Sequence, residues 1–301
     1  MLSILIPTYN YNITQLVNDL HSQAVESLAE VEIIVMEDGS TLFLEENKKI
    51  LQLELCKYDV LQKNIGRSAI RNKLADVAKY EHLLFIDCDA AVNNPNYVQR
   101  YLAFCKEDCV VIGGTAYDEC ENNPDFSLRL KYGREREAKM AQERLQSSHL
   151  SHFSTFNFLI SKNIFNKIRF DETIKGYGHE DTLFGHGVAE LNCDVHHIDN
   201  SLIHKGLDDN ITFISKTENG TKNLYLMYNS HKYPFLVNQS KLLATFIQLK
   251  KYNIHKLLAA VFPLLKQLFI YEMCTKNPSL RVFDIYKLLF ICKISTDKMT
   301  K

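Results

Sequence analysis

Residues 83–89 read LLFIDCD: four apolar residues followed at once by two acids, Asp87 and Asp89, with one cysteine between them. A short apolar run that ends in polar residues is typical of a buried β-strand leaving its sheet. Similar runs recur along the chain, at 2–7, 31–36, 58–62, 110–113 and 156–160. Amphipathic segments typical of helices lie between the earlier runs, at 14–28 and 68–80. This alternation predicts an α/β fold with a mostly parallel central sheet.

The polar residues at the strand ends predict where ligands bind. The carboxyl ends of parallel strands meet at one edge of a sheet, and such sheets bind their ligands there. The segments placed at this edge are Pro7–Asn10, Glu37–Ser40, Asn64–Arg67 and Asp87–Asp89. Three carboxylates, those of Asp38, Asp87 and Asp89, are therefore expected on the same edge.

Asp87 and Asp89 form a D-x-D motif directly after a strand. Two carboxylates one residue apart can hold a hard divalent cation, Mn²⁺ or Mg²⁺, together with the oxygens of a diphosphate. The alternative is a capping aspartate beside a solvated one, because D-x-D also occurs by chance. The position at the end of a buried strand favours the cation site.

Two further motifs each have a ligand-binding interpretation and a structural one. Asp38 lies in MEDGS, where it either forms an ordinary Asp-Gly-Ser turn or accepts the imide N–H of a uracil ring. The segment 64–72, NIGRSAIRN, joins a strand to a helix. Backbone N–H groups at a helix start favour anions, and Arg67 and Arg71 supply permanent charge for phosphate. The alternative is a pair of surface arginines on a helix.

The acidic pair Glu180-Asp181 follows Gly178 and precedes a helix. Acids in the first turn of a helix either complement its dipole or provide a general base for an acceptor hydroxyl. His204 follows the apolar residues SLI. A single histidine is either structural or a metal ligand, and its sequence context leaves both open.

Taken together, these motifs resemble one family. SILIPTYN, EIIVMEDGS, NIGRSAIRN and FIDCDA, in this order over about 90 residues, resemble the family 2 glycosyltransferases, which have the GT-A fold. GYGHEDTLFG, residues 176–185, resembles the acidic acceptor motif of galactosyltransferases and chondroitin-polymerase-like enzymes. The resemblance covers residues 1–210 and leaves out the rest of the chain.

The resemblance implies a role for each matching residue of the donor half. Asp38 would contact uracil, and Pro7 and Tyr9 would line the base pocket. Asn64, Arg67 and Arg71 would lie beside the donor. Asp87 would lie by the ribose and the metal.

It also implies the metal shell and the acceptor side. Asp89 would bind the metal directly, and His204 would complete its shell. Asp181 would be the catalytic base, and Glu180 would hold the acceptor. His179 stands where the family usually has Gly or Trp, so the acceptor pocket is expected to differ.

The implied reaction is inverting transfer of a hexose or N-acetylhexosamine from a UDP-sugar. Its acceptor would be the hydroxyl of a glycan or lipid-linked molecule in polysaccharide assembly. One alternative is a nucleotidyltransferase, which usually has a glycine-rich signature near the first strand; PTYNYN has none. Another is a non-catalytic module of the same fold, which would be expected to lack the D-x-D motif or the acidic pair. No nucleic acid partner is expected.

Bulk properties predict the compartment. The eight cysteines mostly lie in apolar runs, as expected of free thiols in a reducing environment. No signal peptide is recognised at the start, and no run reaches the roughly 18 consecutive apolar residues of a membrane span. We therefore expect a cytoplasmic protein.

The charge divides the chain. Residues 241–301 hold eleven Lys or Arg and three Asp or Glu, whereas the whole chain has a formal charge of −1. We expect a catalytic domain over 1–240, with a donor half to about 115, an acceptor half from about 116, and a charged, mostly solvated helix or mobile loop at 125–148. Two basic amphipathic helices are expected at 241–272 and 279–293. They either pack on the domain or bind an anionic membrane surface.

Overall fold

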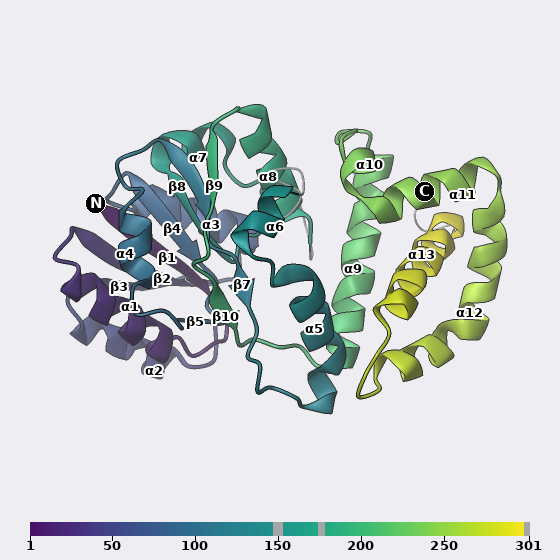
Figure 1. Ribbon diagram of the computed structural model, residues 1–301, viewed down its shortest axis with the longest axis horizontal. Coiled ribbons are helices and arrows are strands. Elements are labelled where there is room, and N and C mark those ends of the chain that lie inside the picture. Colours follow the sequence, from purple (N-terminus) through teal and green to yellow (C-terminus); the bar gives the residue numbers. More distant parts are fainter. Residues whose placement is uncertain (147–152, 174–177, 298–301) are drawn as a thin grey trace. The chain divides into compact units, whose positions relative to one another are not determined.

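The computed structural model describes residues 1–146, 153–173 and 178–297. The chain forms two compact units (Figure 1). The first, here called the sheet unit, comprises Met1–Asp118, Arg136–Lys175 and Glu180–Gly206. The second, here called the helical unit, comprises Glu119–Glu135, Gly176–His179 and Leu207–Lys301.

The sheet unit is built on a seven-stranded sheet in the order β3-β2-β1-β4-β8-β6-β9. Its strands are β1 (Leu2–Thr8), β2 (Val31–Glu37), β3 (Cys56–Val60), β4 (His82–Ile86), β6 (Cys109–Ile112), β8 (Asn157–Ser161) and β9 (Asp194–His197). β8 runs antiparallel to both of its neighbours, and the other pairs are parallel. The predicted α/β fold with a mostly parallel sheet is confirmed. Six of these strands begin and end within about two residues of their predicted bounds, whereas β9 was not predicted.

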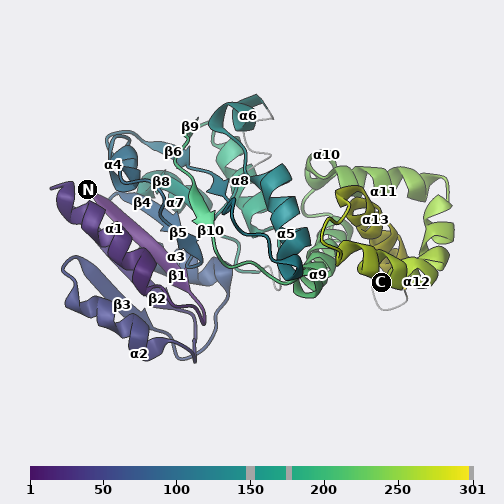
Figure 2. The ribbon, with the colours of Figure 1, turned by 60° about the horizontal axis from the view of Figure 1, so that its bottom comes forward.

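Helices cover both faces of this sheet, so β1 and β2 are buried almost throughout. On one face, α1 (Thr14–Glu26) and α4 (Tyr97–Leu102) pack on Ile4 and Ile6 of β1. Figure 2 shows α1 running alongside β1. On the other face, α3 (Arg67–Val77), α7 (Lys162–Ile168) and α8 (Glu180–Glu190) pack around Leu5 and Phe85.

A small second sheet joins distant parts of the sheet unit. It has the order β5-β10-β7, with β5 (Ala90–Ala91), β7 (Thr115–Ala116) and β10 (Leu202–His204). His204 of β10 pairs with Ala90, the residue that directly follows the D-x-D motif. This pairing brings His204 to the end of β4.

The charged stretch 125–148 differs from its prediction as a mostly solvated helix or mobile loop. Its regular elements are short, and they comprise the 3₁₀ turn Pro124–Phe126, α5 (Ser127–Tyr132), the π-helical turn Gly133–Glu137 and α6 (Ala141–Gln146). In α6 the Arg144 guanidinium is buried and donates to the carbonyls of Ile112, Ile198 and Lys139. Charge alone suggested solvation, but these carbonyl partners allow the arginine to be buried. Residues 147 and 148 lie outside the described residues.

The remaining helices of the sheet unit are the short α2 (Leu44–Asn47) and the 3₁₀ helix Lys48–Gln52. Both follow β2 and precede β3. Ile50 of the 3₁₀ helix is buried in the core cluster that contains α1.

The helical unit contains α5, α9 (Asn210–Asn229), α10 (Leu236–Gln239), α11 (Lys241–Lys251), α12 (Ile254–Met273) and α13 (Leu280–Thr296). The helix predicted over 241–272 is two helices, because the chain turns at Asn253, where φ is +59°. Pro263 lies inside α12, which continues through it, and the second predicted helix matches α13.

The core of the helical unit joins its first and last segments. Leu128 of α5 and Phe213 of α9 pack with Phe262 of α12 and Phe283 of α13. The boundary expected at residue 240 falls within this unit, between α10 and α11. Residues 241–297 therefore pack on α5 and α9, and the division of function at residue 240 stays a prediction.

Candidate active site

The loops that follow β1, β2 and β3 are tied together at the carboxyl edge of the sheet. Asp38 is buried, and its carboxylate accepts the backbone N–H of Ile65 at 2.7 Å and of Gly66 at 3.0 Å. Gly39 has a φ of +70°, and a Cβ there would lie 2.4 Å from the backbone nitrogen of Asn64. Only glycine permits this approach, so Asp38 and the NIGRS loop form one structural element.

The first loop is fixed to the second by Asn10. Its backbone N–H donates to Ser40 Oγ at 2.9 Å, and its side-chain oxygen accepts the N–H groups of Thr41 and Leu42. Pro7 is half-buried. β1 pairs with β4 only as far as Leu5, so the N–H that proline lacks is not needed for the hydrogen bonds between these two strands. Tyr9 is 54% exposed beside it.

Glu37 supports this edge, although the motif analysis did not select it. Its fully buried carboxylate accepts hydrogen bonds from Ser40 Oγ at 2.5 Å, Asn47 Nδ2 at 2.7 Å and the Tyr58 hydroxyl at 3.1 Å. Successive side chains of a strand point to opposite faces of the sheet, so the sequence indicates that Glu37 and Asp38 lie on opposite faces. Glu37 therefore holds the loop that carries Asp38.

Arg71 and Asp87 form a partly buried ion pair. Arg71 Nη2 donates to Asp87 Oδ1 at 2.5 Å, and its guanidinium lies 5.6 Å from the centroid of the Phe170 ring. Arg71 Nε is buried and has no hydrogen-bond partner among the described residues. Arg71 therefore positions Asp87, whereas Arg67, one turn earlier, is exposed.

Asp89 is enclosed by the segment that contains His204. His204 Nε2 lies 3.1 Å from Asp89 Oδ2, and the edges of Tyr117 and Phe156 confine the imidazole. The N–H of Lys205 donates to the Asp89 carbonyl at 2.8 Å. A Cβ at Gly206 would lie 2.3 Å from Asp89 Oδ2, so a side chain there would displace the carboxylate.

The pKa values of the two aspartates of the motif are shifted in opposite directions. Burial raises the pKa of Asp87 above its ordinary value, and Asp89 adds to this rise although Arg71 opposes it. Burial also acts on Asp89, but the hydrogen bond and the charge of His204 bring the pKa of Asp89 below its ordinary value. Two neighbouring carboxylates repel each other, and a cation between them would offset that cost.

Glu180 and Asp181 begin α8, in the position expected from the sequence. Glu180 Oε1 lies 3.4 Å from Arg67 Nη1, which brings the acidic pair to the NIGRS loop. Asp181 is half-buried, and its carboxylate accepts the backbone N–H of Thr182 at 2.7 Å. Gly176 and Tyr177 of the same motif lie outside the described residues.

The edge thus contains two contacting pairs, Arg71 with Asp87 and His204 with Asp89, rather than one closed ligand set. Within the described residues, the group whose three ligand atoms all lie within 4.8 Å of one another is a different one, Glu107, Cys109 and His196. Even so, the oxygens of Asp87 and Asp89 and the imidazole of His204 are donor types that suit a divalent cation.

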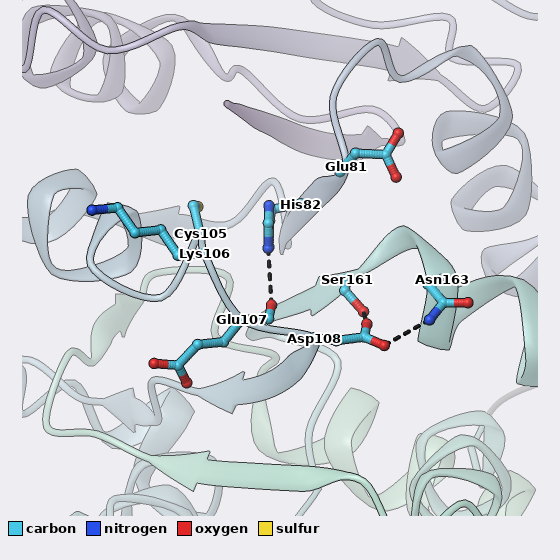
Figure 3. Close-up of a pocket in the computed structure, with 8 residues that line it drawn as sticks. All are labelled: Glu81, His82, Cys105, Lys106, Glu107, Asp108, Ser161 and Asn163. Atoms are coloured by element: carbon cyan, nitrogen blue, oxygen red, sulfur yellow. Dashed lines mark hydrogen bonds between the residues drawn. The ribbon is translucent and has the colours of Figure 1, made fainter.

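A pocket of about 260 Å³ lies at the opposite edge of the sheet (Figure 3). It is lined at the amino ends of β4 and β6 by His82 and Cys105–Asp108, and at the carboxyl end of β8 by Ser161. None of the residues selected from the sequence lines it. This pocket is separate from the candidate active site.

Solved structures of low sequence identity share the fold. A mannosyltransferase from Pyrobaculum calidifontis, solved with GDP-Man and Mn²⁺, matches with a TM-score of 0.57 and 13% identity, over 98% of this chain and 86% of the other. TarS from S. aureus matches with a TM-score of 0.53 and 20% identity, over 98% of this chain and 55% of TarS. These likenesses confirm the GT-A fold.

Curated relatives resemble the chain in sequence. Chondroitin synthase of Pasteurella multocida (strain Pm70) is 29% identical over 67% of this chain and 24% of its own length. Hyaluronan synthase of Pasteurella multocida is 30% identical over 52% of this chain and 19% of its own length. The chain thus matches about a quarter or less of the length of these two synthases. The family model described as glycosyl transferase family 2 matches residues 3–169, more than half of the sequence. The chain belongs to glycosyl transferase family 2.

Proposed function

We propose that this chain transfers a hexose or N-acetylhexosamine from a UDP-sugar to a hydroxyl of a glycan or lipid-linked acceptor, with inversion, in polysaccharide assembly. Family membership and the resemblance to chondroitin and hyaluronan synthases support the class of reaction. The observation that carries the proposal is the carboxyl edge itself. There Asp38, the NIGRS loop, the D-x-D motif and His204 converge from four separate segments, which are the ends of β2, β3 and β4 and the strand β10.

The donor is proposed to bind across the tied loops. Pro7 and Tyr9 line the base pocket, and the Asp38 carboxylate keeps free lone pairs for the imide N–H of uracil. Asn64 and Arg67 are exposed beside this position, where they meet the diphosphate and the sugar. TarS has been solved with UDP-GlcNAc, which agrees with a UDP-linked donor.

Asp87, Asp89 and His204 are the residues proposed to hold a divalent cation, Mn²⁺ or Mg²⁺. When bound, the cation offsets the charge that develops on the departing UDP. Arg71 holds the Asp87 carboxylate in place through their ion pair. The structure of the Pyrobaculum calidifontis mannosyltransferase with Mn²⁺ supports this choice of ion.

The acidic pair is proposed to act on the acceptor. Asp181 accepts the proton of the attacking hydroxyl, and Glu180 positions the acceptor while it stays beside Arg67. A single base and a single displacement invert the anomeric centre. The reaction needs no covalent sugar–enzyme intermediate.

A donor screen tests the proposal. The purified protein, supplied with Mn²⁺ and a panel of UDP-sugars, is expected to release UDP from one or a few of them and to transfer the sugar when an acceptor is added. Release of pyrophosphate from sugar phosphates and nucleoside triphosphates would indicate a nucleotidyltransferase instead. Donor binding by calorimetry without any turnover would indicate a non-catalytic module.

We also propose that the protein acts at the cytoplasmic face of a membrane, bound through residues 241–301. Among the described helices, α12 is long and apolar enough to cross a membrane by length and composition, and only 17% of its most apolar window is buried inside the protein. This differs from the sequence expectation of no membrane span, because apolar residues flank the few polar ones in α12. A single helix of this kind is weak support for crossing.

An interfacial position suits α12 better than a span. Apolar side chains recur on its exposed face at helical spacing, and they are Leu257, Leu264, Leu268 and Tyr271. Its other face packs on α13 and α9 through Phe262. Exposed lysines stand near its start, at Lys250, Lys251 and Lys256. A helix that is apolar outward and basic at one end is typical of an anionic membrane surface.

Substitution of this exposed face is a sharper test than truncation at residue 240, which would uncover the core faces of α5 and α9. The double variant Leu264→Glu/Leu268→Glu is expected to weaken binding to vesicles containing phosphatidylglycerol by at least about tenfold, because each leucine contributes about 1.5–3 kcal/mol when buried. Co-sedimentation measures this.

The matched control is Leu28→Glu, since Leu28 is 95% exposed on the sheet unit. It should bind vesicles as the unchanged protein does. Failure of the unchanged protein to co-sediment at low salt would refute the membrane proposal.

A further inference from the structure

Three side chains that bind metals gather at the amino edge of the sheet, away from the candidate active site. Glu107 lies in the loop before β6, Cys109 is the first residue of β6, and His196 lies in β9. β6 and β9 pair in parallel, with Val111 opposite His196. Cys109 is two residues before Val111, so Cys109 and His196 lie on the same face of the sheet. Their ligand atoms and that of Glu107 all lie within 4.8 Å of one another.

The spacing suits a tetrahedral metal site better than a hydrogen bond. Glu107 Oε2 lies 3.6 Å from His196 Nε2, which is too long for a hydrogen bond. Two ligand atoms bound to one tetrahedral Zn²⁺ at about 2.0–2.1 Å are separated by about 3.3–3.4 Å. A shift of a few tenths of an ångström would therefore bring this pair to bonding positions.

His196 contains an unsatisfied polar atom at this point. Its Nε2 is buried and finds no hydrogen-bond partner in the part of the chain that the structure describes. A buried nitrogen without a partner is costly, and native proteins seldom keep one without a reason. A bound cation would satisfy it.

The backbone of the loop is held in place from the other side. His82 Nε2 contacts the carbonyl oxygen of Glu107 at 3.0 Å, and Asp108 accepts hydrogen bonds from Ser161 and Asn163. In Figure 3 the side chains of Glu107 and Asp108 extend in opposite directions from this loop. The Glu107 carboxylate comes within 3.6 Å of His196 in β9, while Asp108 anchors the loop.

The surroundings of Cys109 are negatively charged. Its side chain is completely buried, Asp108 precedes it in the chain, and Asp194 of β9 lies opposite it in the sheet. A divalent cation would offset this concentration of negative charge.

We propose that Glu107, Cys109 and His196 form a second metal site, selective for a zinc-type divalent cation. The set supplies one thiolate, one imidazole and one carboxylate, which suits Zn²⁺ and poorly suits Mg²⁺ or Ca²⁺. The cation would displace the thiol proton to solvent as it binds. It would join β9, the edge strand of the sheet, to the loop before β6. The site is independent of sugar transfer.

Cobalt substitution tests this site in the purified 301-residue chain. Co²⁺ bound to a thiolate gives a charge-transfer absorption band in the near ultraviolet, and Zn²⁺ should remove that band by competition. The band is expected in the unchanged protein and absent in Cys109→Ser. The matched control is Cys88→Ser. Cys88 lies within the D-x-D motif, so this variant tests whether Co²⁺ at that motif is the source of the band, and it should keep the band.

Glu107→Gln should leave the fold intact, since Glu107 is exposed, so it tests metal binding separately from folding. Loss of a metal ligand should exceed the 10–100-fold effect of losing an outer-shell partner, so Zn²⁺ affinity should fall by about 100-fold or more. The circular dichroism spectrum should not change. The proposal is overturned if the unchanged chain gives no band, if Cys88→Ser rather than Cys109→Ser removes it, or if Glu107→Gln binds Zn²⁺ as tightly as before.

Discussion

Replacement of Asp89 by alanine is expected to reduce sugar transfer by on the order of 10³-fold or more. Asp89 is the residue of the D-x-D motif whose carboxylate faces His204 at 3.1 Å, and the pair would hold the cation on the diphosphate. Stabilisation of a leaving group by a cation is worth several kcal/mol, and each 1.36 kcal/mol is tenfold in rate. UDP release from the donor, followed with saturating Mn²⁺, measures the loss.

Chelation provides the second half of this test. EDTA should abolish transfer by the unchanged protein, and Mn²⁺ or Mg²⁺ should restore it. Asp59→Ala is the matched control, because Asp59 is an exposed aspartate of β3 in the same unit. It should keep the activity. Full activity in excess EDTA, or normal turnover by the Asp89 variant, would contradict the metal assignment.

The architecture could be read from the sequence because strands and helices of an α/β fold carry different periods. Runs such as LLFI are buried on both faces, so they read as continuous apolar segments, and the helices between them show one apolar stripe. The carboxyl-edge rule then predicts from the sequence alone that Asp38 and Asp87 lie on one edge.

What the sequence could not supply was the partner of each charged group. Arg71 was assigned to phosphate, but the structure buries it against Asp87, 16 residues later in the chain. Asp38 was assigned to uracil, and its carboxylate also holds the loop at Ile65. Such partners depend on how strands pack, which local sequence does not encode. Glu37 was placed at this edge by the sequence, but its hydrogen bonds to Ser40, Asn47 and Tyr58 could not be predicted for the same reason.

The pattern of charged and apolar residues also failed to predict which helix faces are buried, because tertiary contacts decide this. The segment containing Arg144 is predicted to be solvated, yet its buried guanidinium donates to three backbone carbonyl oxygens. The sequence leaves open whether the apolar residues of 241–272 pack or face a membrane, and in the structure Phe262 is buried whereas Leu264 is 81% exposed. In both cases the sequence gives the composition of a helix but not which of its faces is covered.

The acidic pair provides the second large effect, through Asp181→Asn. This change keeps the size and the hydrogen-bonding shape of the side chain but removes the group that accepts a proton. Turnover should fall by on the order of 10²–10⁴-fold, the usual contribution of general base catalysis. The amide oxygen can still accept the N–H of Thr182, so the start of α8 should persist. Calorimetric binding of UDP should therefore be unchanged.

Glu180→Gln distinguishes the two acids of the pair. Glu180 lies beside Arg67 rather than toward Thr182, so its loss should raise the KM for the acceptor more than it lowers kcat. If Glu180→Gln lowers kcat further than Asp181→Asn does, the base is Glu180 and the roles are reversed. If UDP affinity collapses in Asp181→Asn, Asp181 supports the donor site and a different residue must take the proton. A drop in kcat with intact UDP binding is the result that places the base at Asp181, because only a group engaged in the reaction changes turnover without changing the bound state.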